Sequence, residues 1–171
     1  MIYLGIDPGH DGALAIIDDC APAARWIPMP MVHAAKGKPQ YDVKALHEFF
    51  AVVGRDVGSR GIYAACERLT ALPPTMGGSS ANYARGRSLG LLEALMVATH
   101  TPYALVQPKA WQKVMLAGTP GDDTKQRSIL ACQRLFPSVS LMRTERCRKP
   151  HDGAADALLI AEYGRRKLLS G

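Results

Sequence analysis

The sequence has no long hydrophobic run and no clustered cysteines, and both absences narrow what the protein can be. No apolar stretch approaches the roughly 18 to 20 residues that a membrane-spanning helix needs. The first residues lack the basic stretch followed by an apolar one that is typical of a secretory signal. The four cysteines are scattered without a Cys-x-x-Cys pair, which argues against a zinc site and favours reduced thiols. We therefore expect a cytoplasmic protein with no membrane partner.

The composition is that of a globular protein with a polyanionic partner. Hydrophobic residues make up 47% of the 171 residues, enough for a core, and the length predicts a single domain over residues 1–171. The net charge of +6 and the pI of about 9.3 favour nucleic acid as the partner, although any single basic residue could be plain solvated surface. We predict DNA binding by three basic groups: Arg85 with Arg87, Lys109 with Lys113, and Arg143, Arg146, Arg148 with Lys149.

Apolar strands and amphipathic helices alternate along the chain. Strands are predicted over residues 1–7, 12–18, 24–27, 61–67 and 102–108, and helices over residues 42–54, 81–99, 109–116, 122–136 and 151–169. Residues 28–40 and 69–80 lack periodicity and are predicted to be loops. Residues 8–11 have the length of a hairpin loop between the first two strands. A hairpin followed by alternating helices and strands predicts an α/β fold, with a mixed sheet and helices on both faces.

Four carboxylates stand where such a fold could bring them together. Asp7 ends the first predicted strand and Glu67 ends the fourth, so both emerge at one edge if these strands are neighbours. Asp152 and Asp156 are four residues apart and share one helix face. A bound divalent cation would offset their mutual repulsion, and oxygen ligands suit a hard cation such as Mg²⁺. Two Mg²⁺ ions roughly 4 Å apart could clamp the attacking and leaving oxygens of a phosphodiester.

Each carboxylate also has a purely structural interpretation. Asp7 belongs to an Asp-Pro-Gly sequence that favours turns, and Asp152 could be the N-cap of the last helix. Asp156 and Glu67 are harder to explain in this way, because apolar neighbours place both beside buried surface. Together the four side chains favour a metal centre.

Three motifs occur in order along nearly the whole chain: "GIDPG" with "GALAIID", then "ACE" at the end of a strand, then "HDGAADALLIA" near the C-terminus. In this order and spacing they resemble the RuvC-type Holliday junction resolvases of the ribonuclease H-like superfamily, and "HDG" would fit a phage-type branch. The resemblance implies a five-stranded mixed sheet with strand order 3-2-1-4-5 and a two-fold homodimer. It further implies an endonuclease of DNA recombination and repair. This enzyme would use Mg²⁺, two ions for which Mn²⁺ can substitute, to hydrolyse two strands of a four-way DNA junction.

The resemblance also implies which residues act. Asp7, Glu67 and Asp156 match three of the four acidic metal ligands of the family. The fourth ligand typically stands three residues before the last one, where this chain has Gly153. Asp152 is therefore the candidate for the fourth ligand and His151 the alternative.

Lysines after the fifth strand contact the substrate near the scissile phosphate in the family. Lys113 and Lys125 stand at comparable positions and are the predicted catalytic lysines, with Lys109 as the competitor for the first place. We also expect the long helix over residues 81–99 to contribute to a dimer interface.

Three other functions compete with junction resolution. The first is a ribonuclease H-like nuclease that acts on other branched DNA or on RNA–DNA hybrids. The second is an ATP-binding protein of the actin and sugar-kinase fold, which would need a second such domain and a second phosphate loop. The third is a non-catalytic DNA-binding module, against which Asp7, Glu67 and Asp156 count.

Overall fold

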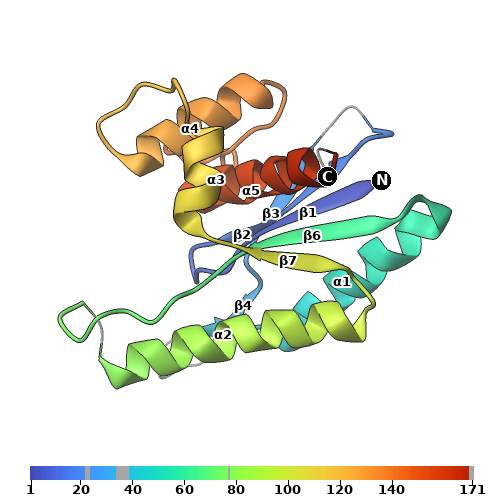
Figure 1. The fold of residues 1–171 in the computed structure, drawn as a ribbon, viewed down its shortest axis with the longest axis horizontal. Helices are drawn as coiled ribbons and strands as arrows, with labels where there is room; N and C mark the ends of the chain where they lie inside the picture. The colour runs from blue at the N-terminus through green and yellow to red at the C-terminus, as the bar shows by residue number, and fades with distance from the viewer. Residues whose placement is uncertain (22–23, 34–38, 77, 170–171) are drawn as a thin grey trace.

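The structure is a computed structural model that describes residues 1–21, 24–33, 39–76 and 78–169. A five-stranded mixed sheet forms its centre (Figure 1). Its strands are β1 (Ile2–Asp7), β2 (Ala13–Asp18), β3 (Arg25–Pro28), β6 (Ile62–Glu67) and β7 (Tyr103–Val106), in the order β3-β2-β1-β6-β7. Strand β2 runs antiparallel to both β1 and β3, whereas β1, β6 and β7 are parallel. The predicted α/β class and mixed five-stranded sheet are therefore confirmed.

The predicted strand order, 3-2-1-4-5, differs from the observed order, 3-2-1-6-7. The difference comes from a two-stranded ribbon in the region predicted to be a loop, where β4 (Met31–Val32) pairs antiparallel with β5 (Gln40–Tyr41). Strands of two residues are too short to show an alternating pattern, so periodicity did not reveal them. Residues 34–38 of that predicted loop, and Gly77 of the predicted loop over residues 69–80, lie outside the described residues.

The helices begin and end close to the predicted positions. They are α1 (Val43–Val57), a 3₁₀ turn (Gly58–Arg60), α2 (Ser79–Ala98), α3 (Pro108–Met115), α4 (Thr124–Leu135) and α5 (Asp152–Leu169). Asp42 caps α1, since its carboxylate accepts a hydrogen bond of 3.0 Å from the N–H of Ala45. The predicted end of α1 at Gly54 is wrong. The helix continues to Gly58, whose φ of 53° is accessible to glycine at little cost.

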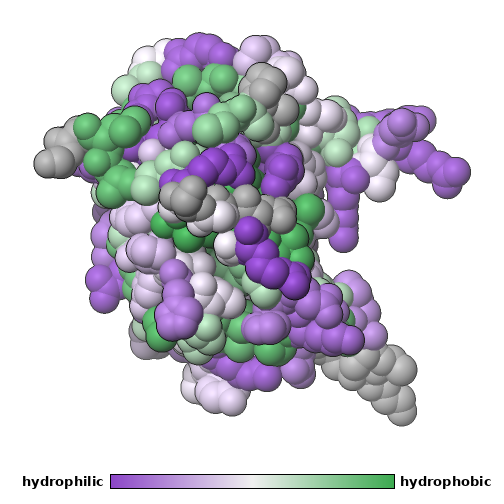
Figure 2. Space-filling model, turned by 90° about the vertical axis from the view of Figure 1, so that its right-hand side faces the viewer, coloured by the Kyte–Doolittle hydropathy of each residue, from purple (hydrophilic) through white to green (hydrophobic). Residues whose placement is uncertain are grey.

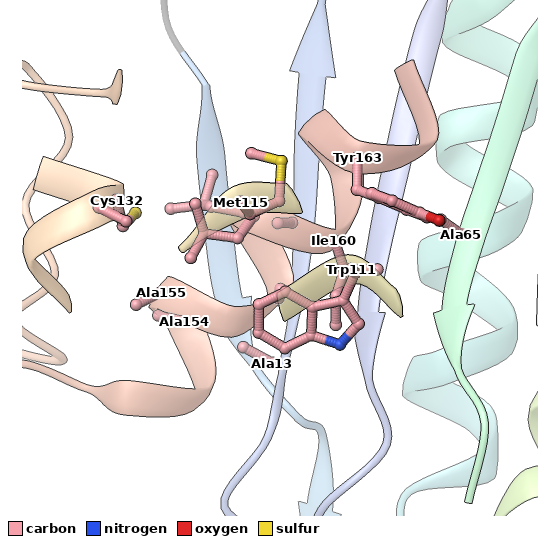
Figure 3. Packing of buried hydrophobic residues seen from close by; sticks show 14 of the residues in the cluster. Ala13, Ala65, Trp111, Met115, Cys132, Ala154, Ala155, Ile160 and Tyr163 are labelled. Atoms are coloured by element: carbon pink, nitrogen blue, oxygen red, sulfur yellow. The ribbon is translucent and has the colours of Figure 1, made fainter. Parts of the chain in front are cut away.

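The helices divide between the two faces of the sheet, as predicted (Figure 1). Helices α1 and α2 lie below the sheet in this view, and their Phe50 and Met96 pack with Leu4 of β1. Helices α3, α4 and α5 lie above it and form a second core with side chains such as Trp111 and Ile160 (Figure 3). Strand β1 is thus buried on both faces, which explains its nearly continuous apolar sequence. In the part of the chain that the structure describes, no helix is long and apolar enough to cross a membrane.

Helix α5 crosses β1 at very short distance because small residues meet at the crossing. A Cβ atom on Gly5 would lie 1.9 Å from the carbonyl oxygen of Ala157 and 2.5 Å from the backbone nitrogen of Ala161. Farther along α5, a Cβ atom on Gly164 would lie 2.9 Å from that of Ala65 on β6. The close approach fixes the position of Asp156, the residue before Ala157, relative to the end of β1.

Ionic contacts hold the far end of α5. The side of the molecule where β1 begins and α5 ends faces the viewer in Figure 2, and hydrophilic residues are spread widely over it. Arg165 lies 3.7 Å from the carboxylate of Asp19, just after β2. The buried Glu162 accepts hydrogen bonds of 2.7 Å from Arg165 and from Arg166. Burial alone would raise the pKa of Glu162, but these two guanidinium groups outweigh it and hold the pKa below its usual value.

We expect Gly5→Ala to lower the free energy of unfolding by about 2–4 kcal/mol, because α5 would have to move away from β1. Gly90→Ala on α2 is the matched control, since a Cβ atom there would meet nothing within 4 Å. The control should raise the free energy of unfolding by about 0.5–1 kcal/mol through helix propensity. Urea unfolding measures both variants, and wild-type stability of Gly5→Ala would contradict the close crossing.

Candidate active site

The structure places the four predicted carboxylates at one edge of the sheet. Strands β1 and β6 pair in parallel with Ile6 opposite Cys66, so the residues that follow, Asp7 and Glu67, lie side by side. Helix α5 begins over the same edge and carries Asp152 and Asp156 in its first two turns. The edge therefore gathers negative charge from two strands and one helix.

The electrostatics of this edge oppose ionisation of the carboxyl groups. Burial, and then the charges of Asp156 and Glu67, raise the pKa of Asp7 to about 8, although the backbone N–H of Gly9 acts in the opposite direction. Burial also raises the pKa of Asp156 to about 6, against the influence of the Ser128 hydroxyl. The pKa of Glu67 is raised by burial as well. Keeping all of these groups charged near neutral pH calls for a compensating cation.

The donor set fits a divalent cation in its chemistry, although its side chains do not converge. The buried Oδ1 atom of Asp156 makes no hydrogen bond, and neither does the Ser128 hydroxyl close to the same carboxyl group. An orphaned carboxylate oxygen of this kind is costly, and a hard cation that prefers oxygen ligands would satisfy it. Among the described residues, however, no three His, Cys, Asp or Glu side chains stand close enough to hold a metal ion together. The carboxylates are neighbours that would have to draw closer around an ion.

Lys125 reaches this edge from the first turn of α4. Its Nζ atom lies 2.5 Å from Oδ2 of Asp152. The ion pair raises the pKa of Lys125. Burial alone would raise the pKa of Asp152, but Lys125 outweighs it and holds that pKa below its usual value. The second predicted catalytic lysine, Lys113, is exposed on α3. Its side chain does not line the cleft over the carboxylate edge that is described below.

Gly153 occupies a position that no side chain could take. A Cβ atom there would lie 2.4 Å from the carbonyl oxygen of Asp11, 2.9 Å from the Cα atom of Gly12 and 3.0 Å from Oδ2 of Asp7. The start of α5 is thus pressed against the β1–β2 hairpin. A carboxylate three residues before Asp156 is therefore sterically excluded, and Asp152 is the acidic residue next to it.

His151 caps α5. Its Nδ1 atom accepts a hydrogen bond of 3.1 Å from the N–H of Ala154, and its ring packs against Trp26 at a centroid distance of 5.2 Å. Burial lowers the pKa of His151, which favours the neutral ring that this contact needs. The interpretation of Asp152 as the N-cap is therefore wrong, because Asp152 is the first residue inside the helix.

A cleft of about 620 Å³ lies over the carboxylate edge. The hairpin loop after β1, the start of α5 and the segment before α5 line it, and it holds Asp7, Asp152 and Asp156 together with the cations Lys125, Arg143 and Lys149. All six of these residues were predicted from the sequence, whereas His10 and Asp11, which also line the cleft, were not. Their position in the four-residue hairpin loop directly after Asp7 could have predicted that they lie beside this carboxylate.

The other predicted DNA-binding residues lie outside this cleft. Arg85 of α2 donates a hydrogen bond of 3.0 Å to the carbonyl oxygen of Thr70 and lines a neighbouring hollow that shares Gly9 and His10 with the cleft. Arg87 lies 3.4 Å from the side-chain oxygen of Gln40, and Lys109 lines a separate hollow with Thr70. Arg146 and Arg148 are exposed in the segment before α5.

One contact at this edge was not predicted. The indole N–H of the fully buried Trp111 donates a hydrogen bond of 2.8 Å to Oε2 of Glu67. The two residues are 44 positions apart, so their pairing left no local signal in the sequence. From the sequence alone, Trp111 is indistinguishable from an ordinary apolar residue of a short helix.

Comparisons with known proteins agree with this fold. No family model matches the sequence, and no curated relative matches it. The structure is similar to RuvC from T. thermophilus in complex with a Holliday junction substrate, with a TM-score of 0.62 and 19% identity over 100% of this chain and 96% of that chain. A second T. thermophilus RuvC structure has a TM-score of 0.55 and 21% identity, over 98% and 97% of the two chains. The resemblance seen in the motifs is thereby confirmed at the level of the fold, which is that of RuvC.

We expect the metal-free protein to lose stability as the pH rises from about 4 to about 8. A carboxyl group whose pKa is raised on folding, from 3.8 to about 8 for Asp7, stabilises the protein in its protonated form. That contribution is complete below the unfolded-state pKa and is lost as the pH rises through the folded-state value.

Asp7→Asn removes the contribution of Asp7 to this pH dependence and keeps an oxygen that can accept from the backbone N–H of Gly9. In chelator it should raise the free energy of unfolding by about 1–3 kcal/mol at pH 8 and change it little at pH 4. Urea unfolding at the two pH values provides the measurement, with Asp122→Asn at an exposed position as control. Equal effects of Asp7→Asn at both pH values would refute the electrostatic description.

Proposed function

We propose that the protein is a Mg²⁺-dependent endonuclease that resolves four-way DNA junctions by hydrolysing phosphodiester bonds in two strands. The observation that carries this proposal is the carboxylate edge itself: Asp7, Glu67 and Asp156 are neighbours there, and Asp156 has an unsatisfied buried oxygen. The fold supports it, because RuvC has been captured in complex with a Holliday junction substrate.

Asp7, Glu67, Asp152 and Asp156 would hold the metal, two Mg²⁺ ions for which Mn²⁺ can substitute. When bound, divalent cations of this kind activate a water molecule and stabilise the leaving oxygen. The carboxylates themselves would orient the attacking water through hydrogen bonds. Lys125, already beside Asp152, would neutralise negative charge that develops on the scissile phosphate.

The basic residues around the cleft would position the DNA. Arg143 and Lys149 line the cleft and would bind phosphates next to the scissile one. The remaining basic positions would bind phosphates farther out: Lys109, Lys113, Arg85, Arg87, Arg146 and Arg148. Contacts of this type supply affinity and a strong salt dependence rather than sequence specificity.

A four-way junction needs two cuts, so we infer a homodimer of single nuclease domains, each spanning residues 1–171. Helix α2 is the proposed contribution to its interface. Tyr83 and Val97 on this helix are 73% and 62% exposed and would be available to a partner subunit.

The second candidate is a ribonuclease H-like nuclease for other branched DNA or for RNA–DNA hybrids. It is favoured by the fact that each chain carries its own carboxylate edge, which suffices to cut a single strand. Cleavage assays on a four-way junction, a linear duplex and an RNA–DNA hybrid, each with Mg²⁺ and with chelator, separate the two. Junction resolution requires Mg²⁺-dependent cleavage of the junction well above that of the other substrates.

We expect Asp7→Asn and Asp156→Asn to abolish junction cleavage and to leave junction binding intact or tighter. Each change removes a metal ligand and also relieves repulsion of the DNA phosphates. Cleavage and gel-shift assays on the same preparations separate the two effects. Mg²⁺-dependent cleavage at a near wild-type rate in either variant would contradict the assignment of these carboxylates as metal ligands.

Lys125→Ala should slow cleavage of bound junction by about 100-fold, because the lysine acts on the transition state. Single-turnover cleavage at saturating enzyme measures this rate without a contribution from affinity. Arg146→Ala is the matched control. It should weaken DNA binding and lower the slope of log affinity against log salt concentration by about one unit. The rate at which bound junction is cleaved should stay unchanged. If Lys125→Ala only weakened binding, the lysine would belong with the outer basic residues.

A further inference from the structure

We propose that Trp111 is a positioning residue for Glu67, in which the indole N–H holds one carboxylate oxygen and leaves the other for the metal ion. The inference rests on the proposed function, because it concerns a residue that would bind the metal. Trp111 lies in the core and would contact neither the metal ion nor the DNA directly.

The indole is held where it can do this. Trp111 is fully buried on α3, among side chains that include Ala13, Met115 and Leu158. In Figure 3 its nitrogen lies on the lower rim of the ring, on the side away from Met115 and Cys132. The ring cannot turn without disrupting this packing, so the 2.8 Å hydrogen bond to Oε2 of Glu67 is rigid on the donor side.

A buried indole needs an acceptor, but it does not need a carboxylate. Trp26, the other tryptophan, shows the ordinary solution: its Nε1 donates a hydrogen bond of 2.8 Å to the backbone carbonyl oxygen of Ser140. Trp111 instead binds an acidic side chain at the end of β6, beside Asp7. The choice of acceptor links the core under α3 to the carboxylate edge.

The expected benefit is preorganisation. A glutamate side chain has several rotatable bonds, and immobilising it when a metal ion binds costs conformational entropy. A rigid donor on one oxygen removes part of that cost in advance and limits the carboxylate to a single free oxygen. Partners that orient metal ligands in this way typically contribute 10- to 100-fold in metal affinity.

Trp111→Phe tests the inference because it removes the N–H and keeps most of the ring. The affinity of the full chain for Mn²⁺ without DNA should fall about tenfold. Electron paramagnetic resonance of the free Mn²⁺ measures this affinity. Trp26→Phe is the matched control, because it makes the same chemical change at a tryptophan whose N–H binds a backbone carbonyl oxygen. Phenylalanine keeps an aromatic ring against His151, so this variant should bind Mn²⁺ as the wild type does. In cleavage assays, Trp111→Phe should need more Mg²⁺ for half-maximal activity and recover its rate at saturating Mg²⁺.

A second measurement applies even if Trp111→Phe does not fold. Trp26→Phe leaves Trp111 as the single tryptophan, so its emission reports on the hydrogen bond to Glu67. Saturating Mg²⁺ should shift the emission maximum, because the charge on the acceptor is shared with the metal ion.

The outcomes separate this inference from the proposed function. Wild-type Mn²⁺ affinity in a folded Trp111→Phe, or an unchanged emission maximum in Trp26→Phe with Mg²⁺ bound, would overturn the role of Trp111 alone. A wild-type protein that binds no Mn²⁺ would overturn both the role of Trp111 and the metal-dependent function.

Discussion

The contact between Gly5 and the backbone of Ala157 is the constraint on which the candidate site depends. Because neither side of this crossing carries a bulky side chain, α5 lies directly on β1. The same approach presses Gly153 against the hairpin loop and so places Asp152 and Asp156 over the end of the strand that carries Asp7. The ionic contacts of Arg165 and Glu162 hold the other end of the helix. A helix fixed at both ends and at its crossing delivers its carboxylates to one defined place.

This geometry gathers charge that the fold alone does not neutralise. Lys125 compensates Asp152, but Asp7, Asp156 and Glu67 remain in an environment that raises the pKa of each, Glu67 in spite of the hydrogen bond from Trp111. Proteins tolerate such an arrangement at functional sites, where a ligand restores the balance. Residues of α4 and α3 hold Asp152 and Glu67, so the helices above the sheet contribute to the site as well as to the core.

Much of the fold was predictable because its signals are local. The apolar runs of β1, β2 and β6 and the cap of α1 at Asp42 each depend on residues within a few positions of one another. The errors occurred where local signals were weak or ambiguous. The β4–β5 ribbon is too short for a pattern, and Gly54 is a helix residue although glycine often marks a helix end.

The sequence by itself determined which carboxylates could meet, since Asp7 and Glu67 end apolar strands and Asp152 and Asp156 share a helix face. It also determined that a basic segment precedes the last helix. Only the tertiary structure decided how these residues are partnered: Lys125 on Asp152, Trp111 on Glu67, and no partner on Oδ1 of Asp156. Such pairings join residues far apart in the chain. They depend on how closely helices pack on a sheet, a distance set by opposing surfaces that no local pattern records.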